Sequence, residues 1–241
     1  MFDRLLMNYV NPQWFGARGN DPSFDDSPGI QAAIDFLCGT QQQGGIVLLP
    51  NATFYLYSKI YLKRNISLIG AGSCPHTPYE GGTYLVIKKF QETDPAHEAI
   101  IIGDSVKDPN PGYSSIENLA IYGGLYNADS NCVGIKIAYC ASMIYLQRVS
   151  VVSCYNGLEI HPDSWGIIAE RCYFYMNHIY GISIPSNVQG DGIARNCTFI
   201  QCSILDNNQY DVGINVAQNI SFYDCNIEST SIATVNNVYI T

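Results

Sequence analysis

The chain has 241 residues, of which 47% are apolar and only 14% are charged, and its net charge is −9. This composition excludes intrinsic disorder, which requires few apolar residues and many charges, and the acidic balance argues against a nucleic-acid partner, because no basic stripe is available for phosphates. No apolar run approaches the roughly 20 residues that a membrane-spanning helix needs, so we expect no membrane insertion.

The first predicted element is a helix that begins after Asp25 and Asp26. Ser27 is a good N-cap, Pro28 suits the first helical position, and Gly39 is placed to end the helix. The apolar residues within it recur at helical spacing, which predicts a single apolar face: Ile30, Ala33, Ile34, Leu37 and Cys38. The apolar run before it, residues 5–7, is too short for a signal peptide, so we expect no export signal.

Short strands follow the helix. Four apolar runs separated by turns are expected to form them, at residues 46–49, 54–56, 60–62 and 66–69. Residues 73–112 are rich in Pro and Gly and predict an irregular excursion, with strands of its own around 84–87 and 99–102.

The rest of the chain repeats. One ladder of similar segments begins at Asn118, Arg148, Arg171, Asn196 and Asp224, and a second at Ile135, Leu158, Ile182, Ile214 and Val238. Steps of 23 to 32 residues in both ladders indicate a repeat architecture. Each unit has at least two short strands and no helix pattern, so we predict an all-β fold: a right-handed parallel β-helix in which each repeat forms one rung and adjacent strands lie about 4.8 Å apart.

The ladders also predict the core. Leu119, Val149, Cys172, Cys197 and Cys225 should share one inward column, and Ile121, Val151, Phe174, Phe199 and Ile227 another. Nine cysteines without a CxxC pair indicate buried free thiols rather than a disulfide framework. We therefore predict neither a metal site nor a cofactor.

These expectations divide the chain into an N-terminal segment with a capping helix, residues 1–45, and a continuous β-helix, residues 46–241. The amphipathic helix would cover the open N-terminal end of the coil. Residue 241 falls inside a predicted strand, so we expect that the chain is a fragment or that another subunit covers this end.

A family resemblance begins before the helix. Residues 11–20 read NPQWFGARGN, and they are followed by DDS at 25–27, IQAAID at 30–35, GIVLLP at 45–50 and ISLIGAG at 66–72. This pattern resembles the start of the pectate-lyase-like β-helix superfamily, and most of all the branch found in bacteriophage tailspikes and appendages. The match covers about the first 72 residues. Asn20 stands where the family usually has Asp, and residues 51–53 depart from its Pro-Gly-Thr; both differences lie in turns.

The resemblance implies a homotrimer on a phage tail, in contact with other tail proteins, that binds and often cleaves a host surface polysaccharide. The absence of an export signal and the free cysteines fit assembly in the reducing host cytoplasm and a final location in the virion tail.

One outward patch carries the predicted binding site. The first ladder places Arg148, Arg171, Tyr173 and Tyr175 on neighbouring rungs. Tyrosine faces stack on sugar rings, and Arg donates to carboxylates or hydroxyls, so this patch suits an acidic glycan. A trimer interface is the alternative, because it is also enriched in aromatic residues and Arg; ordinary solvated surface is the third.

The catalytic candidates are carboxylates. Glycoside hydrolysis needs two carboxyl groups about 5–5.5 Å or 6.5–9.5 Å apart. Glu170 lies beside Arg171, and Glu117 shares its register two rungs away, about 10 Å off. The second ladder offers Glu159, followed by Asp163 and by Trp165 as a sugar platform.

No carboxylate pair stands out. Glu159 sits one rung from Lys136 and has the alternative of a simple ion pair. In a lyase, Arg148 or Arg171 would serve as the base, but no Asp cluster for Ca²⁺ is visible.

Three functions remain open at this point. The first is a tailspike-type receptor-binding protein, with or without depolymerase activity. The second is a non-enzymatic trimeric adhesin or structural module. The third is a stand-alone polysaccharide lyase or glycoside hydrolase, which the lack of an export signal disfavours.

Overall fold

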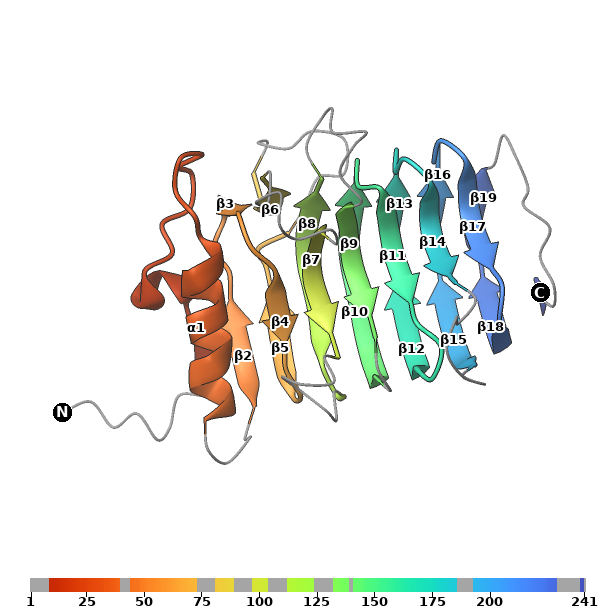
Figure 1. Cartoon of the computed structure of the whole chain (residues 1–241), viewed down its shortest axis with the longest axis horizontal. Helices are drawn as coiled ribbons and strands as arrows, with labels where there is room; N and C mark the ends of the chain where they lie inside the picture. The colour runs from red at the N-terminus through yellow and green to blue at the C-terminus, as the bar shows by residue number, and fades with distance from the viewer. Residues whose placement is uncertain are drawn as a thin grey trace.

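The computed structural model describes residues 9–39, 44–72, 81–88, 97–103, 112–123, 132–138, 141–185, 193–228 and 239–240. They form the predicted right-handed parallel β-helix, with one α-helix at its N-terminal end (Figure 1). Each rung of the coil has three faces, and all strand pairs within the faces are parallel.

The first face contains β1 (Tyr9–Val10), β2 (Gly45–Leu48), β5 (Ile66–Ile69), β8 (Ser115–Tyr122), β10 (Ser142–Val152), β12 (Trp165–Glu170), β15 (Ala194–Ile200), β18 (Ala217–Tyr223) and β20 (Tyr239–Ile240). β8 and β10 continue around a corner into the second face, whose other strands are β3 (Ala52–Leu56), β6 (Thr83–Ile87), β13 (Tyr173–Tyr175), β16 (Ser203–Leu205) and β19 (Asn226–Glu228). The third face contains β4 (Ile60–Leu62), β7 (His97–Ile102), β9 (Cys132–Ile137), β11 (Asn156–Ile160), β14 (Tyr180–Ile184) and β17 (Tyr210–Ile214).

The two strands expected within residues 73–112 are present as β6 and β7. Both are ordinary members of the coil: β6 pairs with β3 and β8, and β7 pairs with β4 and β9. Residues 73–80, 89–96 and 104–111 lie outside the described part of the chain.

Left-handed residues mark the corners between faces. The corner before the first face has positive φ at Gly44, Asn65, Tyr113, Met143, Gly166, Asn196 and Asn219. The corner between the first and second faces has positive φ at Asn118, Arg148, Arg171, Gln201 and Asp224. Because strand register aligns the members of each set, the same bend recurs rung after rung.

In the first ladder, the predicted register is correct except for the segment that begins at Asn196, and the segment that begins at Asp224 is in its predicted column. Ser150 pairs with Tyr173 as expected, but Tyr173 pairs with Ser203 rather than with Thr198. Asn196 belongs to the corner before the first face, where a left-handed residue is also followed by an inward Cys and an inward Phe. The two corners therefore look alike in sequence, and the prediction assigned Asn196 to the wrong one.

The same slip misplaces Cys197 and Phe199, and the second ladder has two errors of its own. Cys202, not Cys197, continues the column of Cys172 and Cys225, while Cys197 lies on the first face beside Ile220. Phe199 stacks on Phe222, with ring centroids 4.8 Å apart, and not on Phe174. In the second ladder, Ile182 pairs with Val212 instead of Ile214, and Tyr239 joins the first face opposite Ser221.

Buried thiols pack the core as small apolar groups. All seven described cysteines are free, and the Sγ atoms of Cys172 and Cys202 lie 3.5 and 3.4 Å from backbone carbonyl oxygens of the preceding rung, those of Leu146 and Ala169. The Cys172 thiol and burial raise the pKa of Cys202 to about 12, and burial raises that of Cys197 to about 12. These thiols therefore stay protonated and unreactive at neutral pH.

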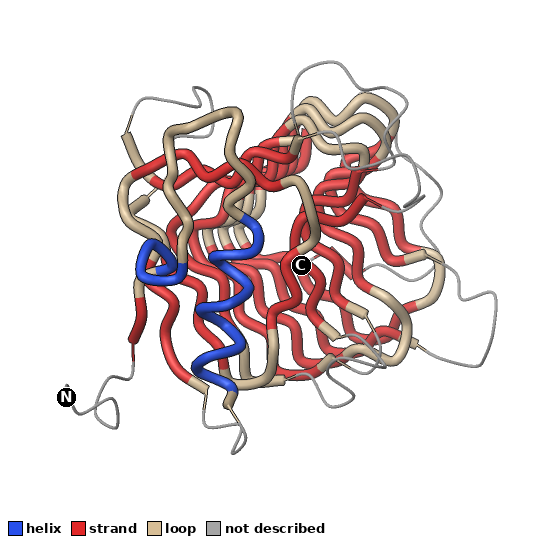
Figure 2. Tube along the Cα trace, turned by 60° about the vertical axis from the view of Figure 1, so that its left-hand side comes forward, coloured by secondary structure: helices blue, strands red, loops and turns tan. Residues whose placement is uncertain are grey.

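The helix α1 (Ser27–Cys38) lies across the end of the coil (Figure 2), and its apolar residues belong to the same buried core as the first rung. Gly39 ends it as predicted, with a φ of 40°. The N-cap prediction is wrong by one residue: Asp26 holds that position. The Ser27 hydroxyl instead accepts the backbone N–H groups of Tyr57 and Ser58, because it faces the turn after β3.

Candidate functional site

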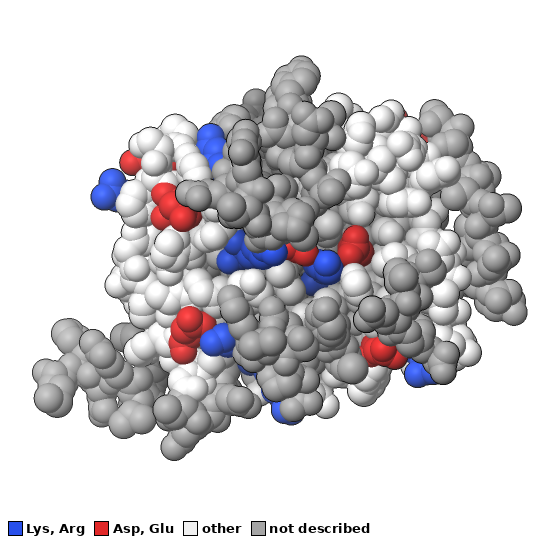
Figure 3. Space-filling model, viewed as in Figure 1, with Lys and Arg blue, Asp and Glu red and all other residues white. Residues whose placement is uncertain are grey.

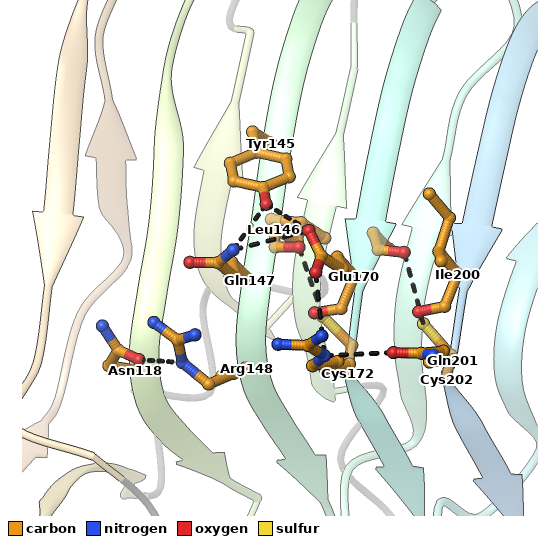
Figure 4. A network of polar contacts seen from close by, with 12 residues as sticks. Asn118, Tyr145, Leu146, Gln147, Arg148, Glu170, Cys172, Ile200, Gln201 and Cys202 are labelled. Carbon is orange, nitrogen blue, oxygen red and sulfur yellow. Dashed lines mark hydrogen bonds and ion pairs between the residues drawn. The ribbon is translucent and has the colours of Figure 1, made fainter.

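A polar network occupies the outer side of the first face (Figure 4). The Tyr145 hydroxyl on β10 donates to Oε2 of Glu170 on β12 at 2.6 Å, and it accepts from Gln147 Nε2 at 2.6 Å. Gln147 Nε2 also lies 3.4 Å from the same carboxylate oxygen. Strand register places Gln147 directly opposite Glu170, so the three side chains meet across two adjacent strands.

This network fixes the charge of Glu170. The hydrogen bond from Tyr145 lowers the pKa of Glu170, and Gln147, Arg171 and Arg148 lower it further, against the opposing effect of burial. Burial and the hydrogen bond to Glu170 raise the pKa of Tyr145 to about 12. At neutral pH the site therefore holds an ionised carboxylate and a protonated phenol, which suits Glu170 to anchor a hydroxyl or act as a base rather than to donate a proton.

A second carboxylate shares the column. Glu117 on β8 pairs with Gln147, so it lies two strands from Glu170, as the sequence predicts. The Ser115 hydroxyl lies 2.8 Å from Glu117 Oε1 and 2.9 Å from the Ser67 hydroxyl. Two strand spacings amount to about 9.6 Å between backbones, close to the upper limit for a pair of inverting carboxylates.

Two exposed arginines border the network at the corner. Arg148 and Arg171 lie on neighbouring rungs, and both have left-handed backbones. Arg148 Nε donates to Oδ1 of Asn118, whereas Arg171 Nε donates to Oε1 of Gln201 at 3.1 Å and lies 3.7 Å from Oε1 of Glu170. Amides on the flanking rungs thus hold the two guanidinium groups side by side at the corner, along one edge of the carboxylate column (Figure 4).

Tyr173 and Tyr175 lie just past this corner on β13, where the sequence places them. Both are half-buried, and their ring centroids are 5.4 Å apart at a tilt of 42°. Burial raises the pKa of Tyr173. The structure therefore brings Arg148, Arg171, Tyr173 and Tyr175 together on one surface that begins at Glu170.

Trp165 and Asp163 lie at the opposite edge of the first face from the two arginines. Asp163 is exposed in the turn before β12 and has a φ of 71°. Trp165 opens β12 and is 47% exposed. Both belong to the rung of Glu170, but at its opposite corner.

Glu159 is on a different face from Glu170. It projects from β11 on the third face, where Lys136 Nζ lies 3.7 Å from Oε1, His161 Nε2 lies 3.0 Å from it, and Asn156 donates to Oε2. Burial acts to raise the pKa of Glu159, but the hydrogen bond with His161 and the charge of Lys136 outweigh it, so the pKa is lowered. The ion pair with Lys136, which the sequence offered as the alternative role of Glu159, is present. Glu159 and Glu170 do not form one site, because they project from different faces.

Glu159 ends a longer row of charges. Lys136 also binds Oε1 of the buried Glu98 at 3.0 Å, and Lys59 binds Oε2 of Glu98 at 2.9 Å. Figure 3 shows basic and acidic side chains alternating in such a row on one face of the molecule. Each charge in the row has an opposite charge beside it, which indicates a structural role.

Sequence reasoning missed Tyr145 and Gln147. The signal was the alternation in residues 144–147, where two inward apolar residues enclose Tyr145 and Gln147 follows as the next outward residue. Within the described ranges, no helix is long and apolar enough to cross a membrane, and no group of three or more His, Cys, Asp or Glu side chains is arranged to hold a metal ion.

Comparison with known proteins identifies the family. The model of the family described as "Rhamnogalacturonase A/epimerase, pectate lyase-like" matches residues 9–229. The chain belongs to this family. A search of curated protein sequences finds no significant match.

Solved structures of this family's fold have several functions. The tailspike gp42 of Acinetobacter phage vb_AbaP_AS12 superposes with a TM-score of 0.70 at 16% identity, over 90% of this chain and 36% of that one. DFA-IIIase from Arthrobacter chlorophenolicus A6 gives 0.69 at 13% identity, over 91% and 57%. PfbA, a surface adhesin of Streptococcus pneumoniae, gives 0.65 at 15% identity, over 90% and 57%. The chain thus spans about a third to three fifths of these relatives, which share its fold.

Proposed function

We propose that this chain is the β-helix part of a phage tailspike-type protein that binds an acidic host surface polysaccharide on the outer side of the first face. The observation that carries the proposal is the corner where Arg148 and Arg171, held by flanking amides, adjoin the network of Tyr145, Gln147 and Glu170. Fixed guanidinium forks recognise carboxylates, and the ionised Glu170 and the amide of Gln147 accept and donate hydrogen bonds to sugar hydroxyls.

The likeness to a phage tailspike supports the setting on a virion tail. We propose that the protein is a trimer there, in contact with other tail proteins. The neighbouring Tyr173 and Tyr175 offer an aromatic surface against which a sugar ring can pack.

The electrostatics of Glu170 argue against a role as the general acid of a hydrolase. Hydrolysis requires a carboxyl group with a raised pKa as general acid. Glu170 has a lowered pKa, and the described carboxyl group with a raised pKa, Asp211, is buried on β17, away from this surface. An adhesin-like role is therefore the second candidate beside a depolymerase.

The test of binding is an array of bacterial capsular and O-chain polysaccharides. The Arg148→Ala/Arg171→Ala variant should bind the recognised glycan at least tenfold more weakly, because it loses two charge-assisted contacts of about 1.5–3 kcal/mol each. Arg18→Ala/Lys63→Ala removes the same charge from two surface ion pairs near the capping helix and should bind like the unchanged protein. Equal binding by all three proteins would refute the site.

The test of cleavage uses the same glycan in solution. Reducing ends and the ultraviolet absorbance of unsaturated products are followed over time. Release of either product, abolished in Glu170→Gln, would establish a depolymerase; an unchanged polymer would establish the adhesin.

A further inference from the structure

The corner before the first face contains an anomaly in residue type. Five of its seven aligned left-handed positions hold Gly or Asn, the residues that adopt this conformation most easily. Tyr113 and Met143, on consecutive rungs, are the exceptions. Their side chains are 61% and 44% exposed, so burial in the core does not compensate the backbone strain. Strain of this kind, kept without a packing benefit, points to a function at the surface.

A third exposed apolar side chain lies beside them. Trp165 pairs with Ser142, next to Met143, and is 47% exposed. The Met143 sulfur lies against the Cα side of Gly166, 2.9 Å from where a Cβ would be, so the glycine leaves room for this side chain. Tyr113, Met143 and Trp165 form what we call the corner ridge, which runs along the axis of the coil over three rungs.

An arginine lies at each end of the ridge. The Arg64 guanidinium lies 5.8 Å from the centre of the Tyr113 ring. Arg195 is the strand partner of Trp165 on the next rung, is exposed, and donates from Nε to Oε1 of Gln218 at 3.3 Å. The Arg148–Arg171 corner lies across the first face, with Tyr145 and Glu170 between the two edges.

The ridge by itself is smaller than a stable protein interface. An aromatic side chain exposes about 150–250 Å² in full, so these three partly exposed side chains offer on the order of 300 Å². A stable interface buries about 800 Å² on each partner. A narrow apolar strip bordered by cations matches instead the ring faces and the carboxylates of an acidic sugar chain.

We propose that the corner ridge is a second subsite for the same acidic glycan, in which Tyr113, Met143 and Trp165 contact sugar ring faces while Arg64 and Arg195 bind its carboxylates. The glycan would then have contacts at both corners of the first face, along the ridge at one and at Arg148 and Arg171 at the other. This inference rests on the proposed function and adds an apolar subsite to it.

The test replaces strained apolar residues by the residue type that the corner prefers. In Tyr113→Asn/Met143→Asn, the ridge is lost and the backbone strain is relieved. We expect the melting temperature to stay the same or rise, and the dissociation constant for the array-identified polysaccharide to increase at least tenfold. Loss of affinity without loss of stability separates a binding role from a structural one.

The matched control is Met176→Asn. Met176 is 50% exposed and has a φ of 53°, but it lies at a different corner. This variant should show the same change in melting temperature and unchanged glycan binding.

Each other outcome overturns the inference. If Tyr113→Asn/Met143→Asn binds normally while Arg148→Ala/Arg171→Ala does not, the proposed function stands and the ridge has no part in it. If the ridge variant binds normally but changes the oligomeric mass in light scattering, the ridge is a subunit contact. If the unchanged protein binds no polysaccharide on the array, the proposed function fails and the ridge assignment fails with it.

Discussion

Some left-handed corner positions of the coil hold residues that do not favour this backbone conformation. A left-handed backbone costs a non-glycine residue about 1–2 kcal/mol, and Asn and Asp bear it best. Arg148 and Arg171 occupy such positions between Asn118 and Asp224, and both carry exposed, hydrogen-bonded guanidinium groups. These two residues therefore bear the cost of a left-handed backbone while they present their side chains at the surface.

Asp211, unlike the exposed arginines at the corners, is buried. It occupies an inward position on the third face where three preceding rungs have Gly134, Gly157 and Gly181. Its Oδ1 accepts both the backbone N–H and the side-chain Nδ2 of Asn207, at 3.2 and 2.7 Å. Its Oδ2 has no hydrogen-bond partner among the described residues. Burial raises the pKa of Asp211, and the charges of Asp206 and Glu228 add to the effect.

Because Asp211 is buried, we predict that its ionisation lowers the free energy of unfolding as pH rises. A carboxyl group whose pKa is higher in the folded state stabilises the fold when protonated, and that contribution is lost as pH rises through the folded pKa. Asp211→Asn should therefore raise the free energy of unfolding at neutral pH by on the order of 1 kcal/mol, with no gain below the ordinary pKa of 3.8. Urea unfolding across this pH range measures it.

Asp224→Asn is the control for Asp211→Asn, because it removes the same charge from an exposed corner. A gain of equal size in both variants would show that the overall charge of the protein, and not burial, is responsible.

At the level of elements, the attachment of α1 depends on one carboxylate. Asp26 is fully buried at the start of the helix. Its Oδ1 accepts the backbone N–H groups of Arg18 and Gly19, at 2.7 and 3.1 Å, and its Oδ2 accepts that of Tyr55 at 2.8 Å. One side chain thus joins the N-terminal loop, the helix and β3.

Removal of this carboxylate should loosen the cap of the coil. Asp26→Ala leaves three backbone donors without an acceptor, and we expect a loss of on the order of 3 kcal/mol or more in urea unfolding. Asp25→Ala, which loses weaker bonds to Ser27 and Tyr57 in a half-buried position, should lose about 1 kcal/mol. Equal small losses would contradict the assigned role. Asp26→Asn retains one acceptor and should be intermediate.

The sequence predicts the elements better than their register. The helix, the strands and the stacking of β8, β10 and β13 follow from periodicity, because inward positions must be apolar. The alignment fails at Asn196, which takes the place of Gln201, because both are left-handed corner residues followed by an inward Cys. Which corner a residue occupies depends on loop length, and local pattern does not encode it.

The candidate site shows the same limit. Arg148 and Arg171 can be found from the sequence because the repeat aligns them at one corner, and Glu170 directly precedes Arg171. Tyr145 and Gln147 become visible only when β10 and β12 are paired, since their hydrogen bonds to Glu170 cross from one rung to the next.

At the level of the whole molecule, the tailspike proposal requires assembly. A static light-scattering experiment should give a molar mass three times the 26.6 kDa of one chain. A trimer would direct the search for sugar contacts to grooves between subunits as well as to the first face. A stable monomer that binds glycan would instead favour a stand-alone enzyme or a portion that lacks the trimerising part.

The cysteine column has a consequence for how such a molecule can change. The coil takes 30 residues to pass from Cys172 to Cys202 and only 23 from Cys202 to Cys225, yet each passage advances the column by one rung. The additional residues lie between β14 and β15 in the sequence, and the strands on both sides of them keep their pairing with the next rung. New outward side chains and loops on two or three rungs could therefore change what the surface binds, while every other rung keeps its neighbours.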